Sequence, residues 1–246
     1  MAAYSFQQSE HDHCLFFKRL DYGFIGLLVY VDDVLIMAPS VLLISHVKTY
    51  HHNLFTIKDL GCAYYFLGLQ IARSDIETAI TQTKYTVDII SNCCLLQAKS
   101  ATTPLPPCLQ MHYDDDDRLV DPEPYRRLVG CLLYLSLTRP DISHWVQQLN
   151  QFIQHPCISH WQTALHLVRY LKGTSAKCLF LPSSNSLLVQ AFCDADRAAC
   201  PNRRSLTGFC IFLCPTLISW KTKKCVKFLV LPPKPNIAAF LPLSVS

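Results

Sequence analysis

Two adjacent carboxylates, Asp32 and Asp33, interrupt an otherwise apolar stretch at residues 24–37. Neighbouring carboxylates repel each other, so both remain charged away from bulk water only when a cation neutralises them. Mg²⁺ suits such hard oxygen ligands, and two metal ions could activate an attacking hydroxyl and stabilise a leaving phosphate oxygen. The tetrapeptide 30–33 alone, however, favours an ordinary exposed acidic turn, because adjacent acids are common in turns.

The residues around the acidic pair predict a β-hairpin. Runs 26–31 and 34–38 are short, apolar and rich in β-branched side chains, which is typical of strands. We therefore expect Asp32 and Asp33 to form a two-residue loop between them. Asp-Asp is a poorer turn pair than Asn-Gly, and local rules are often broken at functional sites. The same carboxylates exclude a membrane span, which needs about 20 nearly uninterrupted apolar residues.

The remaining elements predict an α+β fold. Helical apolar spacing occurs in four segments, the last with Ser159 as its expected cap: 41–54, 84–94, 142–153 and 159–171. Strand composition occurs in four others, of which the last three suggest an antiparallel meander: 64–72, 187–193, 208–213 and 217–220. The polar, proline-rich segment 103–124 predicts a linker, and its four aspartates at 114–117 a solvated loop.

Composition indicates a globular protein. Of the 246 residues 50% are apolar and 16% charged, which excludes disorder and gives room for one large or two small domains. The net charge of +4 permits nucleic-acid binding without requiring it. The 13 cysteines are scattered, and Cys210 and Cys214 lack a second metal-binding pair, so reduced thiols are favoured over zinc. Without a recognisable signal peptide, we expect an intracellular location in cytoplasm, nucleus or organelle.

An ordered series of motifs gives a more specific interpretation. The stretch LLVYVDDVLI at 27–36 resembles the polymerase hairpin of copia-type retrotransposon reverse transcriptases. Six further motifs are similar to the blocks that follow it in that family, in the same order: LFTIKDLG at 54–61, YFLGL at 65–69, QTKY at 82–85, YRRLVG at 125–130, LTRPDI at 137–142 and YLKGT at 170–174. Each motif alone is weak, whereas their shared order is specific.

The resemblance implies a polymerase site. It makes Asp32 and Asp33 catalytic ligands of Mg²⁺ and Tyr30 a nucleic-acid contact. Four residues correspond to the primer grip, which positions the 3′ end of the primer: Tyr65, Phe66, Leu67 and Gly68. The implied partner is an RNA or DNA primer–template, with no membrane and no specific protein partner. Residues 1–103 would form a partial palm, and 104–184 the helical thumb and connection.

A second resemblance begins at FCDAD, residues 192–196, and RRSLTGF, residues 203–209. Both are similar to the opening of the family's ribonuclease H domain, and ISWK at 218–221 is similar to its third strand. The resemblance makes Asp194 a catalytic, metal-binding carboxylate and Asp196 a further metal ligand. Residues 185–225 would then form an incomplete, three-stranded ribonuclease H-like sheet.

Departures from the family predict lost activity. The family's palm uses a third Asp on an earlier strand, which nothing here matches, and Arg197 stands where the family has Trp. Permitted codons for residues 228–238, read in a shifted frame, spell the family motif SRSSAEAEYS, so we hypothesise that the tail 226–246 is frameshifted. Because metal-dependent phosphoryl transfer needs its full carboxylate set, we expect unstable Mg²⁺ binding and negligible activity. The terminal strands should expose an apolar face and an edge.

Two alternatives remain open. The first is a non-catalytic nucleic-acid-binding module, although a solvated basic rim would give the same pattern. Its support is a group of basic residues near aromatic ones: Arg203, Arg204, Lys221, Lys223 and Lys224, with Phe209, Phe212 and Trp220. The second is a domesticated host protein with an unrelated partner.

Overall fold

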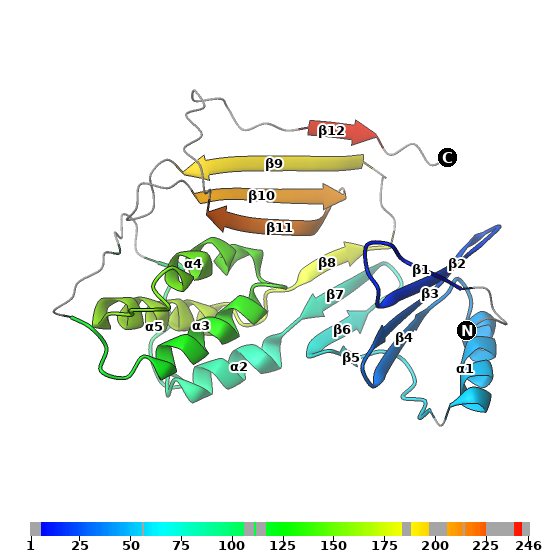
Figure 1. Cartoon of the computed structure of the whole chain (residues 1–246), viewed down its shortest axis with the longest axis horizontal. Helices are drawn as coiled ribbons and strands as arrows, with labels where there is room; N and C mark the ends of the chain where they lie inside the picture. The colour runs from blue at the N-terminus through cyan, green and yellow to red at the C-terminus, as the bar shows by residue number, and fades with distance from the viewer. Residues whose placement is uncertain are drawn as a thin grey trace. The chain divides into compact units, whose positions relative to one another are not determined.

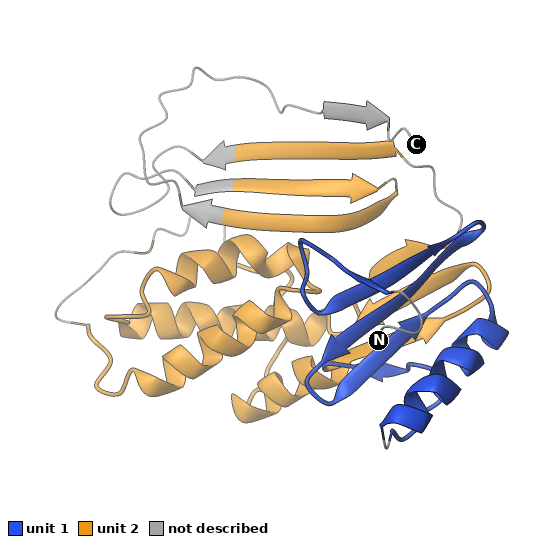
Figure 2. Ribbon diagram, turned by 45° about the vertical axis from the view of Figure 1, so that its right-hand side comes forward, with its two compact units in different colours: residues 1–67 blue, residues 68–246 orange. Residues whose placement is uncertain are grey.

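The computed structural model describes residues 6–55, 57–105, 111, 117–183, 188–196, 206–213, 215–224 and 239–242. Its helices and antiparallel sheets confirm the predicted α+β class (Figure 1). The chain divides into two compact units, Met1–Leu67 and Gly68–Ser246 (Figure 2). No helix among the described residues is long and apolar enough to cross a membrane.

Unit 1 contains an antiparallel sheet with the strand order β1-β2-β3-β4. Its strands are β1 (Gln7–Gln8), β2 (Leu15–Leu20), β3 (Gly23–Tyr30) and β4 (Asp33–Met37). Helix α1 (Val41–Leu54) follows, capped by the Ser40 side chain, which accepts a hydrogen bond from the Leu43 amide at 3.3 Å. Short strand β5 (Tyr65–Phe66) ends the unit.

The core of unit 1 joins strand β3 to helix α1. Ile25 and Leu27 alternate onto one face of β3 and pack with Val47 of α1. All three side chains are at most 2% exposed. The packing of this small core therefore holds the β3–β4 hairpin, which carries the acidic pair, on a helix.

Unit 2 is built around four helices and one large core. They are α2 (Thr83–Asn92), α3 (Glu123–Leu135), α4 (Pro140–Asn150) and α5 (Ile158–Gly173). Apolar side chains recur at helical spacing, as on α3, where five residues are buried: Tyr125, Leu128, Val129, Leu132 and Leu135. These stripes meet those of α2, α4 and α5 in one cluster.

Two antiparallel sheets accompany the helices of unit 2. One contains β6 (Leu69–Arg73), β7 (Glu77–Thr81) and β8 (Leu179–Pro182), so β8 returns to β7 after all four helices. The other has the order β11-β10-β9-β12. Its strands are β9 (Leu188–Asp196), β10 (Leu206–Leu213), β11 (Thr216–Lys224) and β12 (Ala239–Pro242).

The helix predictions are largely confirmed. The predicted segment 41–54 coincides with α1, and the other three match α2, α4 and α5 within a few residues. The predicted cap of the last helix is wrong. Cys157, not Ser159, precedes α5, because the His160 ring accepts the Cys157 amide at 3.0 Å and starts the helix two residues earlier. The central parts of the predicted linker, 106–110 and 112–116, lie outside the described residues.

The prediction of three terminal strands is wrong in their number. The strand Ala239–Pro242 pairs antiparallel with β9, so the sheet has four strands and the β9 edge is occupied. A short apolar segment can satisfy an edge through its backbone whatever its side chains, and sequence pattern did not reveal this pairing. Most of the predicted frameshifted tail lies outside the described residues. Phe192 and Phe209 are 36% and 38% exposed, but they lie on opposite faces of the sheet, because Phe209 pairs with Cys193, the neighbour of Phe192. They therefore do not form the single exposed apolar face that was predicted.

Candidate active site

The acidic hairpin differs by one residue from the predicted geometry. Tyr30 pairs with Asp33, so the two-residue loop is Val31-Asp32 and Asp33 is the first residue of β4. Val31 has a φ of 49°, a conformation that a β-branched residue rarely adopts and that costs about 1–3 kcal/mol. The prediction failed because apolar composition suggested that Val31 was a strand residue, whereas the turn places its side chain 84% exposed in solvent.

Both carboxylates of the pair face solvent. Asp32 and Asp33 are exposed, and neither side chain forms a hydrogen bond or ion pair within the described part of the chain. Their neighbour Tyr30, the predicted nucleic-acid contact, is 50% exposed. Among the described residues no cluster of three or more His, Cys, Asp or Glu side chains could hold a metal ion. The hairpin therefore offers two hard oxygen ligands, which suit Mg²⁺ but do not complete its coordination.

The face of the hairpin opposite the α1 core is packed closely over a glycine. A Cβ atom on Gly26 would lie 2.9 Å from the Met37 side chain and 3.2 Å from that of Phe24. A side chain at position 26 would therefore require the Met37 methyl group, the flexible end of that side chain, and the Phe24 ring to shift. The two strands that carry the acidic loop therefore have side chains packed on both faces.

The motif at 54–61 ties the loop after α1 back to that helix. Lys48 of α1 donates to both oxygens of Asp59, at 2.8 and 3.0 Å, and the Gly61 amide donates to Asp59 Oδ1 at 2.9 Å. The Lys48 hydrogen bond lowers the pKa of Asp59 below its usual value. Gly61 has a φ of 77°, as this turn requires. Asp59 and Gly61 of this motif therefore have a structural role in the turn that follows α1.

The predicted primer-grip residues form a tight turn rather than one continuous strand. The predicted strand 64–72 is broken into β5 and β6 by Leu67 and Gly68, which have φ values of 49° and 77°. Positive φ at both central residues is characteristic of a type I′ hairpin turn. Tyr65 is 52% exposed and Leu67 36%, whereas Phe66 is buried. Tyr65 and Leu67 are therefore the side chains available to a bound strand.

Further motifs of the helical region form one polar network. Arg139 donates to both oxygens of Asp141, each at 2.8 Å, and to the backbone and hydroxyl of Thr174. The Tyr170 hydroxyl also donates to Asp141, at 2.8 Å. These four residues, here called the Asp141 network, join the start of α4 to the end of α5. The motifs LTRPDI and YLKGT stand out in the sequence only by resemblance, and in the structure they contact each other.

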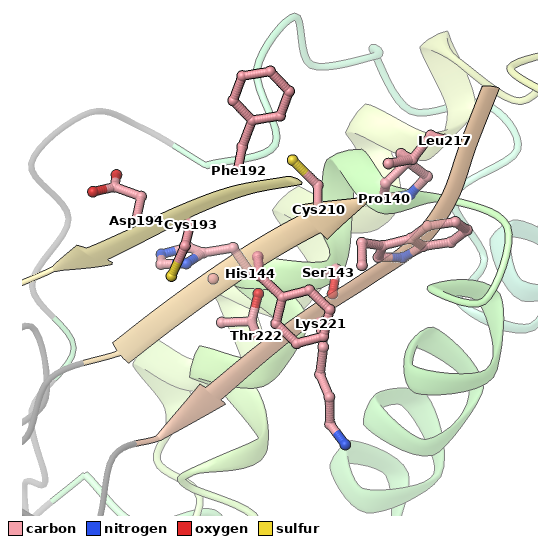
Figure 3. A pocket seen from close by; sticks show the side chains of 13 residues that line it. Pro140, Ser143, His144, Phe192, Cys193, Asp194, Cys210, Leu217, Lys221 and Thr222 are labelled. Carbon is pink, nitrogen blue, oxygen red and sulfur yellow. The ribbon is translucent and has the colours of Figure 1, made fainter. Parts of the chain in front are cut away.

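Asp194, the predicted ribonuclease H carboxylate, lies on β9 opposite Gly208 of β10, which in turn pairs with Thr222 of β11. These residues line a hollow of about 330 Å³ with the start of α4 (Figure 3). Figure 3 shows Asp194 and Phe192 directed to one side of β9 and Cys193 to the other. The side chain of Asp196 lies outside the described residues. Asp194 therefore borders this hollow.

A hydrogen bond from a side chain of this sheet reaches the helices. Trp220 Nε1 of β11 donates to the Ser136 carbonyl, which follows the end of α3, at 2.9 Å. A second hollow of about 400 Å³ lies beside it and shares Ser143, Trp220, Lys221 and Thr222 with the first. Trp220 therefore lines both hollows and ties the sheet to the end of α3.

Comparison with known proteins decides the family. A model described as reverse transcriptase (RNA-dependent DNA polymerase) matches residues 1–107. A putative transposon Ty5-1 protein of Saccharomyces cerevisiae is 33% identical over 89% of this chain and 72% of its own length. The chain belongs to the retrotransposon reverse transcriptases. Residues 1–107 include both the acidic hairpin and the Leu67-Gly68 turn, so the family match covers the two main predicted sites.

Other relatives extend this likeness along the chain. An uncharacterised mitochondrial protein of Arabidopsis thaliana is 40% identical over 80% of this chain and 82% of its own length. The retrovirus-related Pol polyprotein from transposon RE2 of the same plant is 34% identical over 89% of the chain. The chain spans 15% of that polyprotein's length. No solved structure matches the chain.

Proposed function

We propose that this chain is the part of a copia-type retrotransposon reverse transcriptase that carries the catalytic hairpin, the primer grip and the thumb helices. The observation that supports this best is the hairpin tip, where Asp32 and Asp33 are both exposed on a strained loop fixed over the α1 core. Solvent-facing carboxylates on a rigid support are suited to bind Mg²⁺ together with a phosphate substrate. When bound, the metal would stabilise the charge of the transferred phosphoryl group.

The edge of strand β4 is the place where the site can be completed. In the described sheet β4 is the last strand, so its outer edge has no strand partner within the described residues of unit 1. A further strand pairing there would lie about 4.8 Å away and could bring a third carboxylate next to Asp33. We infer that this chain alone binds Mg²⁺ weakly and has negligible polymerase activity.

The C-terminal sheet supports a related proposal. We infer that β9, β10 and β11 are the opening strands of a ribonuclease H-like domain, with Asp194 as its first metal-binding carboxylate and Asp196 as a second. Because one described carboxylate borders the hollow, nuclease activity should be negligible too.

Primer extension with the purified chain tests the main proposal. The chain should give no extension on a primed RNA template with Mg²⁺ or Mn²⁺, and Asp32→Asn should match it. Extension by the chain that disappears in Asp32→Asn but persists in the control Glu10→Gln would overturn the inferred inactivity. Titration with Mn²⁺, followed by electron paramagnetic resonance, should show weak binding that Asp32→Asn and Asp33→Asn reduce further.

Binding of nucleic acid without catalysis is the second candidate function. Lys221 is exposed and lines the first hollow together with Phe209 and Trp220, an arrangement that could pair a phosphate with stacked bases. A gel shift with a primer–template duplex at low and high salt tests this. Absence of a shift at low salt would remove this candidate.

A further inference from the structure

The turn at Leu67-Gly68 touches a residue that lies far away in the sequence. A Cβ atom built on Gly68 would lie 2.9 Å from the hydroxyl oxygen of Tyr134, whereas the next atom of that ring is 3.9 Å away. The hydroxyl alone therefore occupies the space that a side chain at position 68 would need. Both residues belong to unit 2, so the contact lies within one compact body.

Tyr134 is held in place by two helices. It lies near the end of α3, and its ring packs edge-on against Tyr85 of α2, with ring centroids 5.1 Å apart and planes at 85°. Tyr85 also forms a hydrogen bond with Cys131 of α3; burial and this bond raise the pKa of Tyr85 well above its usual value. The Tyr134 hydroxyl thus has a position set by the packing of α2 against α3, and the turn rests against it.

We propose that Tyr134 is a positioning residue for the primer-binding turn: its hydroxyl supports Gly68 and fixes the turn against helices α2 and α3. The inference rests on the proposed role of Leu67-Gly68 in binding the primer. Through this contact a shift of α3 moves the turn, and with it the partly exposed side chain of Leu67. The requirement for glycine at position 68 then has two causes, the positive φ and the hydroxyl.

A matched glycine separates these two causes. Gly61 has the same φ of 77°, but nothing lies within 4 Å of a Cβ placed on it. Gly61→Ala therefore reports the backbone strain alone, whereas Gly68→Ala reports strain and the clash with Tyr134. Tyr134→Phe removes the hydroxyl and leaves the Tyr85 contact in place.

The first measurement is urea unfolding of the full chain carrying each change singly and in pairs. Gly68→Ala should raise the unfolding equilibrium constant about tenfold more than Gly61→Ala, a coupling of the size that touching residues show. Tyr134→Phe should abolish this excess and leave the Gly61→Ala effect unchanged. Equal effects of the two glycine changes, or no rescue by Tyr134→Phe, would show that the Tyr134 hydroxyl does not restrict position 68.

The second measurement concerns primer binding and would not respond to a merely structural role. Fluorescence anisotropy with a labelled primer–template duplex should show about fivefold weaker binding for folded Gly68→Ala, restored by Tyr134→Phe and unaffected in Gly61→Ala. If the unaltered chain binds the duplex but all variants bind equally, the positioning role is wrong and the primer-binding function stands. If the unaltered chain does not bind, the proposed function fails and the inference with it.

Discussion

Arg139 donates two hydrogen bonds of 2.8 Å to the two carboxylate oxygens of Asp141, only two residues further along the chain. Arg139 is 3% exposed, and its remaining donors reach Thr174 at the end of α5. Bidentate pairs of this kind are among the stronger charge-assisted interactions. The Asp141 network therefore fixes the start of α4 to the end of α5, and its charges depend on one another.

Removing the carboxylate of Asp141 should strongly destabilise unit 2. In Asp141→Asn the buried Arg139 guanidinium keeps its charge without a counter-ion, which costs about 3–5 kcal/mol in buried pairs. We expect a loss toward the lower end, about 3 kcal/mol, because Asp141 is 24% exposed. Urea unfolding measures it, with Asp88→Asn on the exposed side of α2 as the control. A loss no larger than the control's would show that the network does not hold these helices together.

Acid should destabilise the chain through the same residue. Burial alone would raise the Asp141 pKa, but the hydrogen bonds and charge of Arg139, with Tyr170 and Lys177, outweigh it and lower the pKa to about 2. A lowered pKa stabilises the folded state above the unfolded pKa of 3.8, and this contribution disappears as pH falls through about 2. We expect Asp141 to account for about 2 kcal/mol lost between these values. Unfolding of Asp141→Asn should lack this part of the pH dependence; an unchanged pH profile would refute the assignment.

The strained loop residue Val31 should be replaceable with a gain in stability. Asparagine tolerates positive φ better than a β-branched residue, and Val31 is 84% exposed, so little burial is lost. We expect Val31→Asn to raise the unfolding free energy by about 1 kcal/mol. The neighbouring change Val34→Asn, in β4, should instead lower it. Thermal unfolding of both variants checks the prediction, and destabilisation by Val31→Asn would contradict the strain.

The anchor of the C-terminal sheet should depend on the indole N–H of Trp220. Trp220→Phe keeps an aromatic ring but leaves the Ser136 carbonyl without this donor, at a cost of about 1 kcal/mol. Faster amide exchange in β11 and at the end of α3 should accompany the loss, while exchange in unit 1 stays the same. Trp161→Phe, on α5, is the control for losing an indole elsewhere. Unchanged exchange in β11 would show that other contacts anchor the sheet.

Much of the fold could be predicted because local pattern specifies it. Helix α1 was predicted with its observed bounds, since its apolar spacing lies within one short segment of the chain. Helix α3 and strands β1, β2, β7, β8 and β12 were missed. β7 is half-buried throughout, and β8 pairs with it from about 100 residues away, so their side chains show no clear alternation. Pairing between strands so far apart in the sequence depends on which strand edges the folded chain brings together.

The candidate site also has parts that the sequence predicted and parts that it did not. The adjacency of Asp32 and Asp33 and the order of the motifs were visible in the sequence, and they identified the family. The sequence did not show that Val31 occupies the turn, because valine is typical of strands. Only the pairing of β3 with β4 gives Val31 its positive φ.

The sequence by itself determined helices α1, α2, α4 and α5, the acidic pair and the ancestry of this protein, because these depend on residue types and spacings along the chain. Tertiary structure alone decided that LTRPDI meets YLKGT in the Asp141 network, that the hydroxyl of Tyr134 rests against Gly68, and that Ala239–Pro242 closes the edge of β9. Each of these contacts joins segments more than 25 residues apart. Their partners are selected by packing of the whole unit, which no local pattern encodes.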